Sequence, residues 1–422
     1  MSRLTASDAP NPGQRQFELN PAHPHYPENR YPNMASPPPV QTEAYIVTAP
    51  GSPITLSTIT YTPIHPDEIL VSVSAFSLCA TDLKAAAGAF LTGPPMILGH
   101  ECAGTVIQAG SATSLRQGDK VILSYASCRA CRECRAGANA YCERLAELNF
   151  TGLRRDGSTA ATFIDSDGKE MPLKGHFFGQ SSMARVVLAR AACAVKVPSE
   201  TTEEEMRMFA SLGCGIQTGA GAIFNVANPK AGSRILVFGA GAVGLAACLA
   251  ARVTEPEMLV LVDNSSVKLG ILPEFVKGAV TDMVDSSTVK DGDELVERLK
   301  GLTSDGRGFD YALDCVGRGD VVRVAHLALR ARGTVITVGG STDTMQFTLS
   351  QHLTRGITYK GTHQGDSVPS VEIPQLLTLW CQGEFPFDEL LTFYEFGDLH
   401  KAIQDVKAGV AIKAVLVNRK VK

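Results

Sequence analysis

The chain has 422 residues, 44% of them hydrophobic and 19% charged, and a formal net charge of −4, so it is long enough for two domains and a large buried core. This balance excludes a predominantly basic nucleic-acid-binding protein and gives no sign of a nucleic-acid or membrane partner. Because no apolar run approaches the ~20 residues of a membrane span and the N-terminus lacks a secretory signal, we expect a cytoplasmic protein.

Residues 1–41 are predicted to form a flexible, proline-rich extension. The first 40 residues hold nine of the 23 prolines and end in the run Pro37-Pro38-Pro39. Apolar side chains are sparse there, so the segment cannot bury enough surface to offset its ordering entropy.

A β-rich domain is predicted over residues 42–215. Short runs typical of strands occur there, such as ILVSVSAFSL (69–78) and DKVILSY (119–125), broken by Gly, Pro and Asn. The pattern favours an all-β, partly open barrel that carries metal-binding loops.

The eleven cysteines are spread unevenly. An odd number in a chain without an export signal argues against a disulfide framework. Four of them crowd into fifteen residues: Cys128, Cys131, Cys134 and Cys142. Four thiolates in one loop make a closed tetrahedral site that suits zinc and leaves no open position for chemistry. We therefore predict a structural zinc in this loop.

A second set of zinc ligands is scattered along the chain. Cys79 in SLCATD, His100 in GHECAGTV and Cys214 in LGCGIQTGAG could each be a buried structural residue, because cysteine is frequent in protein cores. Together, two thiolates and one imidazole form the set that leaves zinc a fourth position for chemistry. Asp82 is predicted to orient His100 through its other ring nitrogen.

Alternating strands and helices are predicted over residues 216–364. The runs RILVFG, MLVLVD, FDYALD and GTVITVGG are continuous apolar segments, which is typical of buried parallel strands. They predict a doubly wound α/β domain. Residues 365–422 show further helix and strand signals and are expected to pack back on the first domain.

A glycine turn, GAGAVG, follows the first of these strands and opens a helix. Gly239 permits the tight turn, Gly241 lets the backbone approach a pyrophosphate, and Gly244 lets the helix pack closely on the strand. Asp263 lies nineteen residues beyond Gly244, the expected place of an acid that binds the adenosine ribose. Its carboxylate would repel a 2′-phosphate, so NAD is favoured over NADP, and Asn264 in the place of an arginine points the same way.

SLCATD, GHECAGTV, the four-cysteine loop, GCGIQTG and GAGAVG occur in the order found in zinc-containing medium-chain alcohol dehydrogenases. The resemblance covers roughly residues 42–420. It implies a GroES-like catalytic domain beside a Rossmann domain, with NAD and two zinc ions per subunit. HFFGQSS (176–182) and the tail from Phe385 to Val417 look most like aryl-alcohol dehydrogenases.

The resemblance also implies roles for single residues at the metal. Cys79, His100 and Cys214 match the catalytic zinc ligands, and Thr81 matches the hydroxyl that accepts the proton of the alcohol. Asp82 and Glu101 match the acids behind the zinc. The chain departs from the family at two positions: Ala80 replaces an Arg or His that contacts the pyrophosphate, and Lys84 replaces the histidine that ends the proton relay.

Further roles concern the cofactor and the substrate. Asp263 and Lys268 match ribose contacts, Val243 backs the nicotinamide, and Lys413 resembles a late basic residue that reaches the pyrophosphate. Pocket-lining positions match Ser124, Phe177 and Phe178. We expect Ser124 to leave room for an aromatic ring.

The expected function is hydride transfer between NAD and a primary, aryl alcohol or aldehyde. A glutathione-dependent formaldehyde dehydrogenase or an aliphatic alcohol dehydrogenase is the alternative within the same chemistry. A zinc- and nucleotide-binding sensor without turnover is the alternative outside it. The resemblance further implies a homodimer or homotetramer, with pairing through edge strands of the nucleotide domain.

Overall fold

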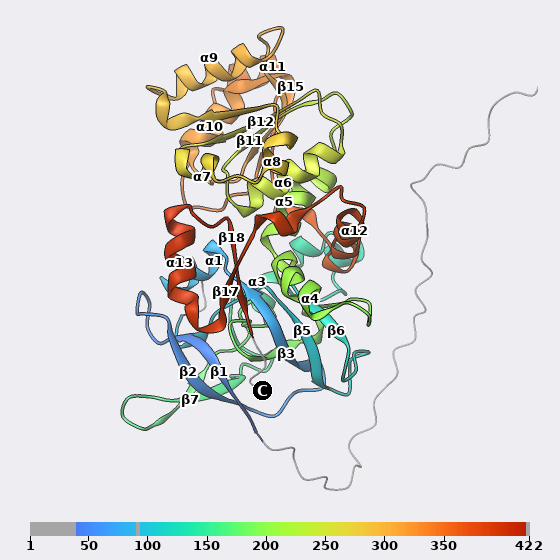
Figure 1. Ribbon diagram of the computed structural model, residues 1–422, viewed down its shortest axis with the longest axis vertical. Coiled ribbons are helices and arrows are strands. Elements are labelled where there is room, and N and C mark those ends of the chain that lie inside the picture. The colour runs from blue at the N-terminus through green and yellow to red at the C-terminus, as the bar shows by residue number, and fades with distance from the viewer. Residues whose placement is uncertain (1–38, 90–92, 419–422) are drawn as a thin grey trace, which may run out of the picture. The chain divides into compact units, whose positions relative to one another are not determined.

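A computed structural model describes residues 39–89 and 93–418 of the chain (Figure 1). The predicted flexible extension lies outside these residues, apart from its last three positions. There the structure differs from the prediction, because strand β1 begins at Val40, two residues before the expected start of the first domain. Within the described ranges, no helix combines the length and the apolar character needed to cross a membrane.

The first part of the fold is built from two sheets. In one, the strand order is β4-β1-β2-β7-β8, and in the other it is β10-β6-β5-β3-β18-β17, with β9 also paired to β3. The first sheet comprises β1 (Val40–Val47), β2 (Thr55–Tyr61), β4 (Met96–Ile97), β7 (Ala161–Ile164) and β8 (Glu170–Leu173). The second comprises β3 (Glu68–Ser77), β5 (Cys102–Ala109), β6 (Lys120–Leu123), β9 (Val186–Arg190), β10 (Ala194–Lys196), β17 (Leu391–Glu395) and β18 (Lys413–Val417).

A parallel sheet with the order β13-β12-β11-β14-β15-β16 forms the second part. Its strands are β11 (Arg234–Phe238), β12 (Met258–Asp263), β13 (Asp282–Asp285), β14 (Phe309–Asp314), β15 (Leu329–Thr337) and β16 (Thr358–Gly361). The order reverses beside β11, which is the arrangement of a doubly wound nucleotide-binding fold. The predicted fold class is therefore confirmed. The sequence runs that predicted strands became β11, β12, β14 and β15, whereas β13 and β16 were not predicted.

Helices cover both faces of this sheet (Figure 1). Ile235 and Val237 of β11 pack into the core that contains α6 (Ala242–Val253). The alternate residues Leu236 and Phe238 pack into the core that contains α9 (Gly292–Leu302) and α10 (Gly319–Ala328). Since successive side chains of a strand point to opposite faces, a continuous apolar run is what a strand buried on both faces requires.

The end of the chain returns to the first part of the fold. β18 pairs antiparallel with β3, with Val415 opposite Ser77, and parallel with β17. The remaining helices are α1 (Ala80–Ala86), α2 (Arg132–Arg135), α3 (Leu145–Asn149), α4 (Glu203–Phe209), α5 (Gly215–Gly221), α7 (Ser266–Gly270), α8 (Glu274–Ala279), α11 (Leu349–Arg355), α12 (Pro369–Cys381) and α13 (Leu399–Ala408). α1, α5 and β5 position the cluster described next.

Candidate active site

Three elements bring four metal-ligating side chains together. Cys79 lies directly before α1, His100 and Glu101 directly before β5, and Cys214 directly before α5. One ligand atom from each lies within 4.8 Å of the others. His100 Nε2 is buried and has no hydrogen-bond partner among the described residues, which is costly unless another group occupies its direction. Two thiols and an imidazole whose Nε2 has no hydrogen bond fit a zinc ion.

Asp82 fixes the orientation of the imidazole. Its Oδ1 lies 2.8 Å from His100 Nδ1 and accepts a hydrogen bond from Gly99 N at 3.1 Å, while its Oδ2 accepts one from Cys79 N at 3.1 Å. Both the carboxylate and the imidazole are fully buried. Because Nδ1 donates its proton to Asp82, the lone pair of Nε2 remains free to face the two thiols. The structure thus places Asp82 where the resemblance put it.

The four-cysteine lobe gathers its sulfur atoms in the same way. One ligand atom from each of Cys128, Cys131, Cys134 and Cys142 lies within 4.8 Å of the others. Backbone N–H groups donate to these sulfurs: Cys131 N to Cys128 Sγ at 3.2 Å, and Cys128 N to Cys142 Sγ at 3.3 Å. The backbone N–H of Cys134 lowers the pKa of the Cys131 thiol to about 6. A lowered pKa favours the thiolate, the form that binds zinc.

The glycine turn has the close packing that its sequence requires. Gly239 adopts a φ of 102°, which favours glycine. A Cβ on Gly244 would lie 1.9 Å from Gly239 O, whereas a Cβ on Gly241 would meet nothing within 4 Å. Gly244 is therefore needed to seat α6 against the strand, and the space beside Gly241 is open to a ligand. Asp263 Oδ2 accepts a hydrogen bond from Ala240 N at 2.7 Å and so holds the turn.

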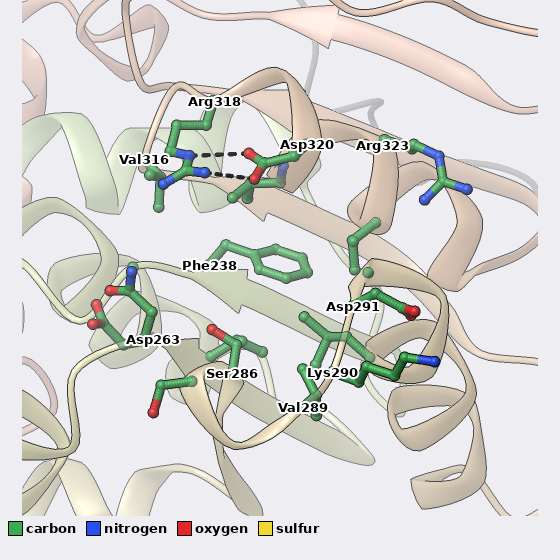
Figure 2. A pocket seen from close by; sticks show the side chains of 18 residues that line it. Phe238, Asp263, Ser286, Val289, Lys290, Asp291, Val316, Arg318, Asp320 and Arg323 are labelled. Carbon is green, nitrogen blue, oxygen red and sulfur yellow. Dashed lines mark hydrogen bonds and ion pairs between the residues drawn. The ribbon is translucent and has the colours of Figure 1, made fainter.

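A cavity of about 540 Å³ adjoins this turn at the carboxyl ends of β11, β12, β13 and β14 (Figure 2). This edge is where open parallel sheets bind their ligands. Asp263 lies on one side of the cavity, with Lys268 Nζ 3.9 Å from its Oδ2. Arg318 lies on another side and is bound to Asp320 by two hydrogen bonds, of 3.0 and 2.6 Å (Figure 2). The charge of this arginine is thus already matched within the protein.

The metal cluster and the glycine turn meet at Gly215. A Cβ placed there would lie 3.8 Å from Val243 Cγ2 and 3.9 Å from Glu101 Oε1. Val243, which is predicted to back the nicotinamide, therefore lies beside the predicted zinc ligands. Thr81 is half-buried on the first turn of α1, two residues after Cys79.

Two family models match the chain, the alcohol dehydrogenase GroES-like domain over residues 65–199 and the zinc-binding dehydrogenase over residues 242–380. The chain is 33% identical to the geraniol dehydrogenase of Castellaniella defragrans over 382 residues, which are 90% of this chain and 98% of that protein. The chain belongs to the zinc-containing medium-chain alcohol dehydrogenases. The dehydrogenase is accordingly an oxidoreductase whose cofactors are zinc and a nicotinamide nucleotide.

Two other relatives bear on the chemistry of the dehydrogenase. It is 29% identical to the S-(hydroxymethyl)glutathione dehydrogenase of Komagataella pastoris, over 89% of this chain and 97% of that protein. The crystal structure of benzyl alcohol dehydrogenase from Acinetobacter calcoaceticus matches it with a TM-score of 0.82 at 32% identity, covering 90% of this chain and all of that one.

Lys413 lies beside the metal cluster. It is 2% exposed, and its Nζ lies 2.6 Å from Glu101 Oε2 and donates to Leu78 O at 3.2 Å. The pairing of β18 with β3 carries it alongside the metal cluster. Although burial opposes its charge, Glu101 raises the pKa of Lys413 above its usual value, and it remains an ammonium. A Cβ on Gly215 would lie 3.7 Å from Lys413 Nζ and 3.8 Å from Val243 Cγ2, on the first turn of α6, so a contact between Lys413 and the pyrophosphate stays a prediction.

Ser124 is held by two buried hydrogen bonds. Its side chain is completely buried, and its Oγ donates to Gly213 O at 2.6 Å and accepts from Gln217 Nε2 at 2.7 Å. Both hydrogen bonds join Ser124 to residues beside Cys214. The room that this small residue leaves for an aromatic ring stays a prediction.

Phe177 and Phe178 pack against the imidazole of His100. They are 0% and 3% exposed, and their ring centroids lie 5.8 and 4.6 Å from that of His100. Phe178 stacks on His100 at an interplanar angle of 29°, while Phe177 meets it edge-on. Such contacts restrict the tilt of the imidazole ring. A contact of either ring with a substrate stays a prediction.

A buried ionic cluster, which the sequence did not predict, lies behind the turn that contains Phe177 and Phe178. Glu68 on β3 accepts from Arg154 Nε at 2.8 Å and from Arg154 Nη2 at 2.8 Å, and His176 Nε2 lies 3.0 Å from its Oε1. His176 directly precedes the two phenylalanines, so the cluster anchors the turn that packs on His100. No signal in the sequence joins residues so far apart in the chain.

This cluster predicts a pH-dependent stability. Although burial opposes ionisation, the hydrogen bonds from His176 and Arg154 lower the pKa of Glu68 to about 2, from 4.5. A carboxyl group whose pKa is lower in the folded than in the unfolded protein stabilises the fold at every pH above its unfolded pKa. Here the contribution is about 3 kcal/mol, and it is lost as the pH falls towards the folded pKa of Glu68. Glu68→Gln should therefore lower the free energy of unfolding near pH 7, and the difference from the unmodified protein should shrink between about pH 4.5 and pH 2.

Denaturant titrations at several pH values would measure this difference. Glu297 is exposed on α9, so Glu297→Gln is the matched control and should leave the free energy of unfolding unchanged. A Glu68→Gln difference that stays constant from pH 7 to pH 2 would contradict the role given to its ionised carboxylate.

Proposed function

We propose that the dehydrogenase transfers hydride between NAD and a primary alcohol whose carbinol carbon is attached to an unsaturated carbon, in an aryl or allylic group. The observation that carries the reaction type is the buried His100 Nε2, which has no hydrogen-bond partner among the described residues and lies close to the sulfur atoms of Cys79 and Cys214. When bound, zinc supplies Lewis acidity to the alcohol or carbonyl oxygen, and NAD accepts or returns the hydride.

The chain's own residues place and hold these groups. Cys79, His100 and Cys214 are the proposed ligands of the catalytic zinc, and Asp82 keeps the lone pair of His100 Nε2 available. Glu101 is held behind them by Lys413, so one charge offsets the other in the buried site. Thr81 is the proposed acceptor of the alcohol's proton. Cys128, Cys131, Cys134 and Cys142 are the proposed ligands of a second, structural zinc.

Lys84 cannot replace a histidine in a proton relay, because an ammonium has no lone pair. Its Nζ donates instead to Gly340 O at 2.8 Å, after β15 of the nucleotide-binding sheet. Lys84 therefore fastens α1 to the nucleotide-binding part of the fold. We propose that protons leave through water rather than through this side chain.

The relatives support the proposed substrate class. Two relatives above 30% identity are named for benzyl alcohol and geraniol, and each of these alcohols carries its hydroxymethyl group on an unsaturated carbon. We expect both to exceed ethanol in kcat/KM by about tenfold or more, because burying a larger apolar group contributes roughly 1.5–3 kcal/mol. NAD reduction assayed with benzyl alcohol, geraniol and ethanol tests this.

S-(Hydroxymethyl)glutathione belongs in the same assay, because a relative 29% identical to the chain is named for it. If S-(hydroxymethyl)glutathione or ethanol has the highest kcat/KM, the proposed substrate class is wrong, whereas the proposed zinc ligands are unaffected. If none of the four is oxidised by a protein with two zinc ions per subunit, the proposed primary-alcohol function falls as a whole.

We further propose that NAD is preferred over NADP by at least tenfold in kcat/KM. The carboxylate of Asp263 would repel a 2′-phosphate, and the guanidinium of Arg318 is already bound to Asp320. Hydrogen bonds to a charged group are worth roughly 1.5–3 kcal/mol, which is one to two decades in affinity. Asp263→Asn removes the charge but keeps an acceptor for Ala240 N, so it should narrow the ratio without unfolding the turn.

Steady-state kinetics with both cofactors measure the ratio, and Asp167→Asn on an exposed loop is the matched control. Equal use of NAD and NADP by the unmodified enzyme would refute the role of Asp263.

A homodimer or homotetramer is proposed from two exposed features at one edge of the nucleotide-binding sheet. All four residues of the edge strand β16 are exposed, which leaves backbone groups free to pair with another strand. On α11, Leu349 and Leu353 are 83% and 81% exposed. Light scattering after size-exclusion chromatography tests this, and a monomer at micromolar concentration would overturn it.

A further inference from the structure

A short segment before α12 has an unusual backbone. Gln364, Gly365 and Asp366 follow one another with φ values of 55°, 66° and 53°, all in the left-handed region. Residues other than glycine rarely adopt this backbone conformation, so it persists only where the surrounding structure enforces it. We call residues Gln364–Asp366 the left-handed arm.

The side chain of Gln364 ends on a proposed metal ligand. It is 7% exposed, and its Nε2 donates to Cys214 Sγ at 3.6 Å. Its Oε1 accepts from Thr218 Oγ1 at 3.3 Å and from Gln217 Nε2 at 3.4 Å. These two donors fix which end of the Gln364 amide faces the sulfur. If the amide were flipped, its NH2 group would face the NH2 group of Gln217, and its oxygen would face the thiolate of Cys214.

The four-cysteine lobe holds the other end of the arm. Tyr141, which directly precedes Cys142, donates from its hydroxyl to Asp366 Oδ1 at 2.6 Å. His363 Nδ1 lies 3.1 Å from Ala140 O, and His363 N donates to the Tyr141 hydroxyl at 3.3 Å. The arm is therefore fastened to the lobe through both side-chain and backbone atoms.

Backbone packing leaves the arm little freedom to move. A Cβ on Gly365 would lie 2.5 Å from Thr218 O, and a Cβ on Gly221 would lie 2.4 Å from Gly365 O. Asn225 Nδ2 donates to Gly365 O at 3.1 Å. The arm thus lies directly against α5, the helix that begins after Cys214. A shift of the arm's backbone would therefore also move the amide group of Gln364.

We propose that Gln364 is a positioning residue that acts on the catalytic zinc through Cys214, and that the four-cysteine lobe holds it in place through Tyr141. This inference rests on the proposed function, in which Cys214 is a ligand of that zinc. An N–H donated to a thiolate draws electron density from the sulfur, so a ligated metal becomes a stronger Lewis acid. The two cysteine clusters are then linked through the arm rather than independent of each other.

The test uses the full chain with cobalt in place of the catalytic zinc, because the cobalt–thiolate absorption band reports the electron density on sulfur. Gln364→Met keeps the volume but removes the N–H, so the band should move to lower energy. In the zinc enzyme, the acid limb of the kcat profile should move to higher pH, with kcat near pH 7 reduced about tenfold. Gln364→Glu places a carboxylate against the sulfur and should shift both further in the same direction.

Tyr141→Phe tests the link without touching either residue of the Gln364–Cys214 contact. It should move the band and the acid limb in the same direction as Gln364→Met, by a smaller amount. Tyr394 donates to Asp405 Oδ2 at 2.9 Å, so Tyr394→Phe removes the same kind of hydrogen bond elsewhere and should change neither readout. Gln382→Met, at an exposed position, is the control for the glutamine change.

The outcomes separate this inference from the proposed function. If Cys214→Ser leaves the cobalt band unchanged, Cys214 is not a ligand, and the proposed ligand set and the inference fall together. If the band depends on Cys214 but not on Gln364, the inference alone is overturned. A Gln364→Met enzyme that loses kcat equally at every pH, with its band in place, would also overturn it. A band that Tyr141→Phe does not move would disprove the link to the lobe.

Discussion

Cys214→Ser should reduce kcat by more than about 100-fold while leaving the four-cysteine zinc and the nucleotide cavity intact. Loss of a residue that merely supports a ligand costs roughly 10–100-fold in metal affinity or activity, so loss of a ligand should cost more. The side chain is buried with Cys79, His100 and Glu101, and no other cysteine among the described residues belongs to that group. Elemental analysis should find one zinc per subunit instead of two.

The matched control for this change is Cys248→Ser. Cys248 is also fully buried, but it lies in the apolar core around α6 and belongs to neither cysteine cluster. It should keep two zinc ions and most of the activity. A Cys214→Ser enzyme that retains two zinc ions and more than a tenth of the activity would refute the proposed ligand set.

Cys128→Ser should have its main effect on stability. The lobe has a small core of its own, formed by Ala126, Leu148 and Cys193 with the cysteines, so the metal must supply much of what holds it together. We expect the free energy of unfolding to fall by more than about 4 kcal/mol, the range that loss of a structural metal can reach. Denaturant titration measures this fall.

Limited proteolysis gives a second readout for Cys128→Ser. Cleavage should appear within residues 128–149, before the rest of the fold is cut, because the lobe opens locally once its metal is lost. Cys381→Ser changes an exposed cysteine and should alter neither readout. A Cys128→Ser protein with unchanged unfolding and full zinc content would show that the lobe holds no structural zinc.

Local patterns were sufficient to predict the cysteine lobe, the glycine turn and four of the parallel strands. In each, the residues that meet in space are also close in sequence, so spacing alone carries the information. Gly244 is an example, because the clash that a Cβ would cause involves Gly239 only five residues earlier. The place of Asp263 follows in the same way from one strand, one turn and one helix.

Contacts between distant segments could not be predicted from these patterns. Lys413 meets Glu101 because β18 pairs with β3 in one register, and nothing in either segment specifies that register. Ser124 was given to the substrate pocket by analogy of position, but its hydroxyl is used by Gly213 and Gln217. The burial of a side chain depends on the whole fold, which a motif does not describe.

The place of β18 between β3 and β17 has a consequence for how the protein is made (Figure 1). A ribosome adds residues in order, so β3, β5 and Glu101 are synthesised long before Lys413. Until then the carboxyl group of Glu101 has no ammonium beside it, and burying its charge alone would be strongly unfavourable. The parallel sheet, complete at Gly361, can form during translation, whereas the ion pair behind the metal cluster forms only after β18 has been synthesised.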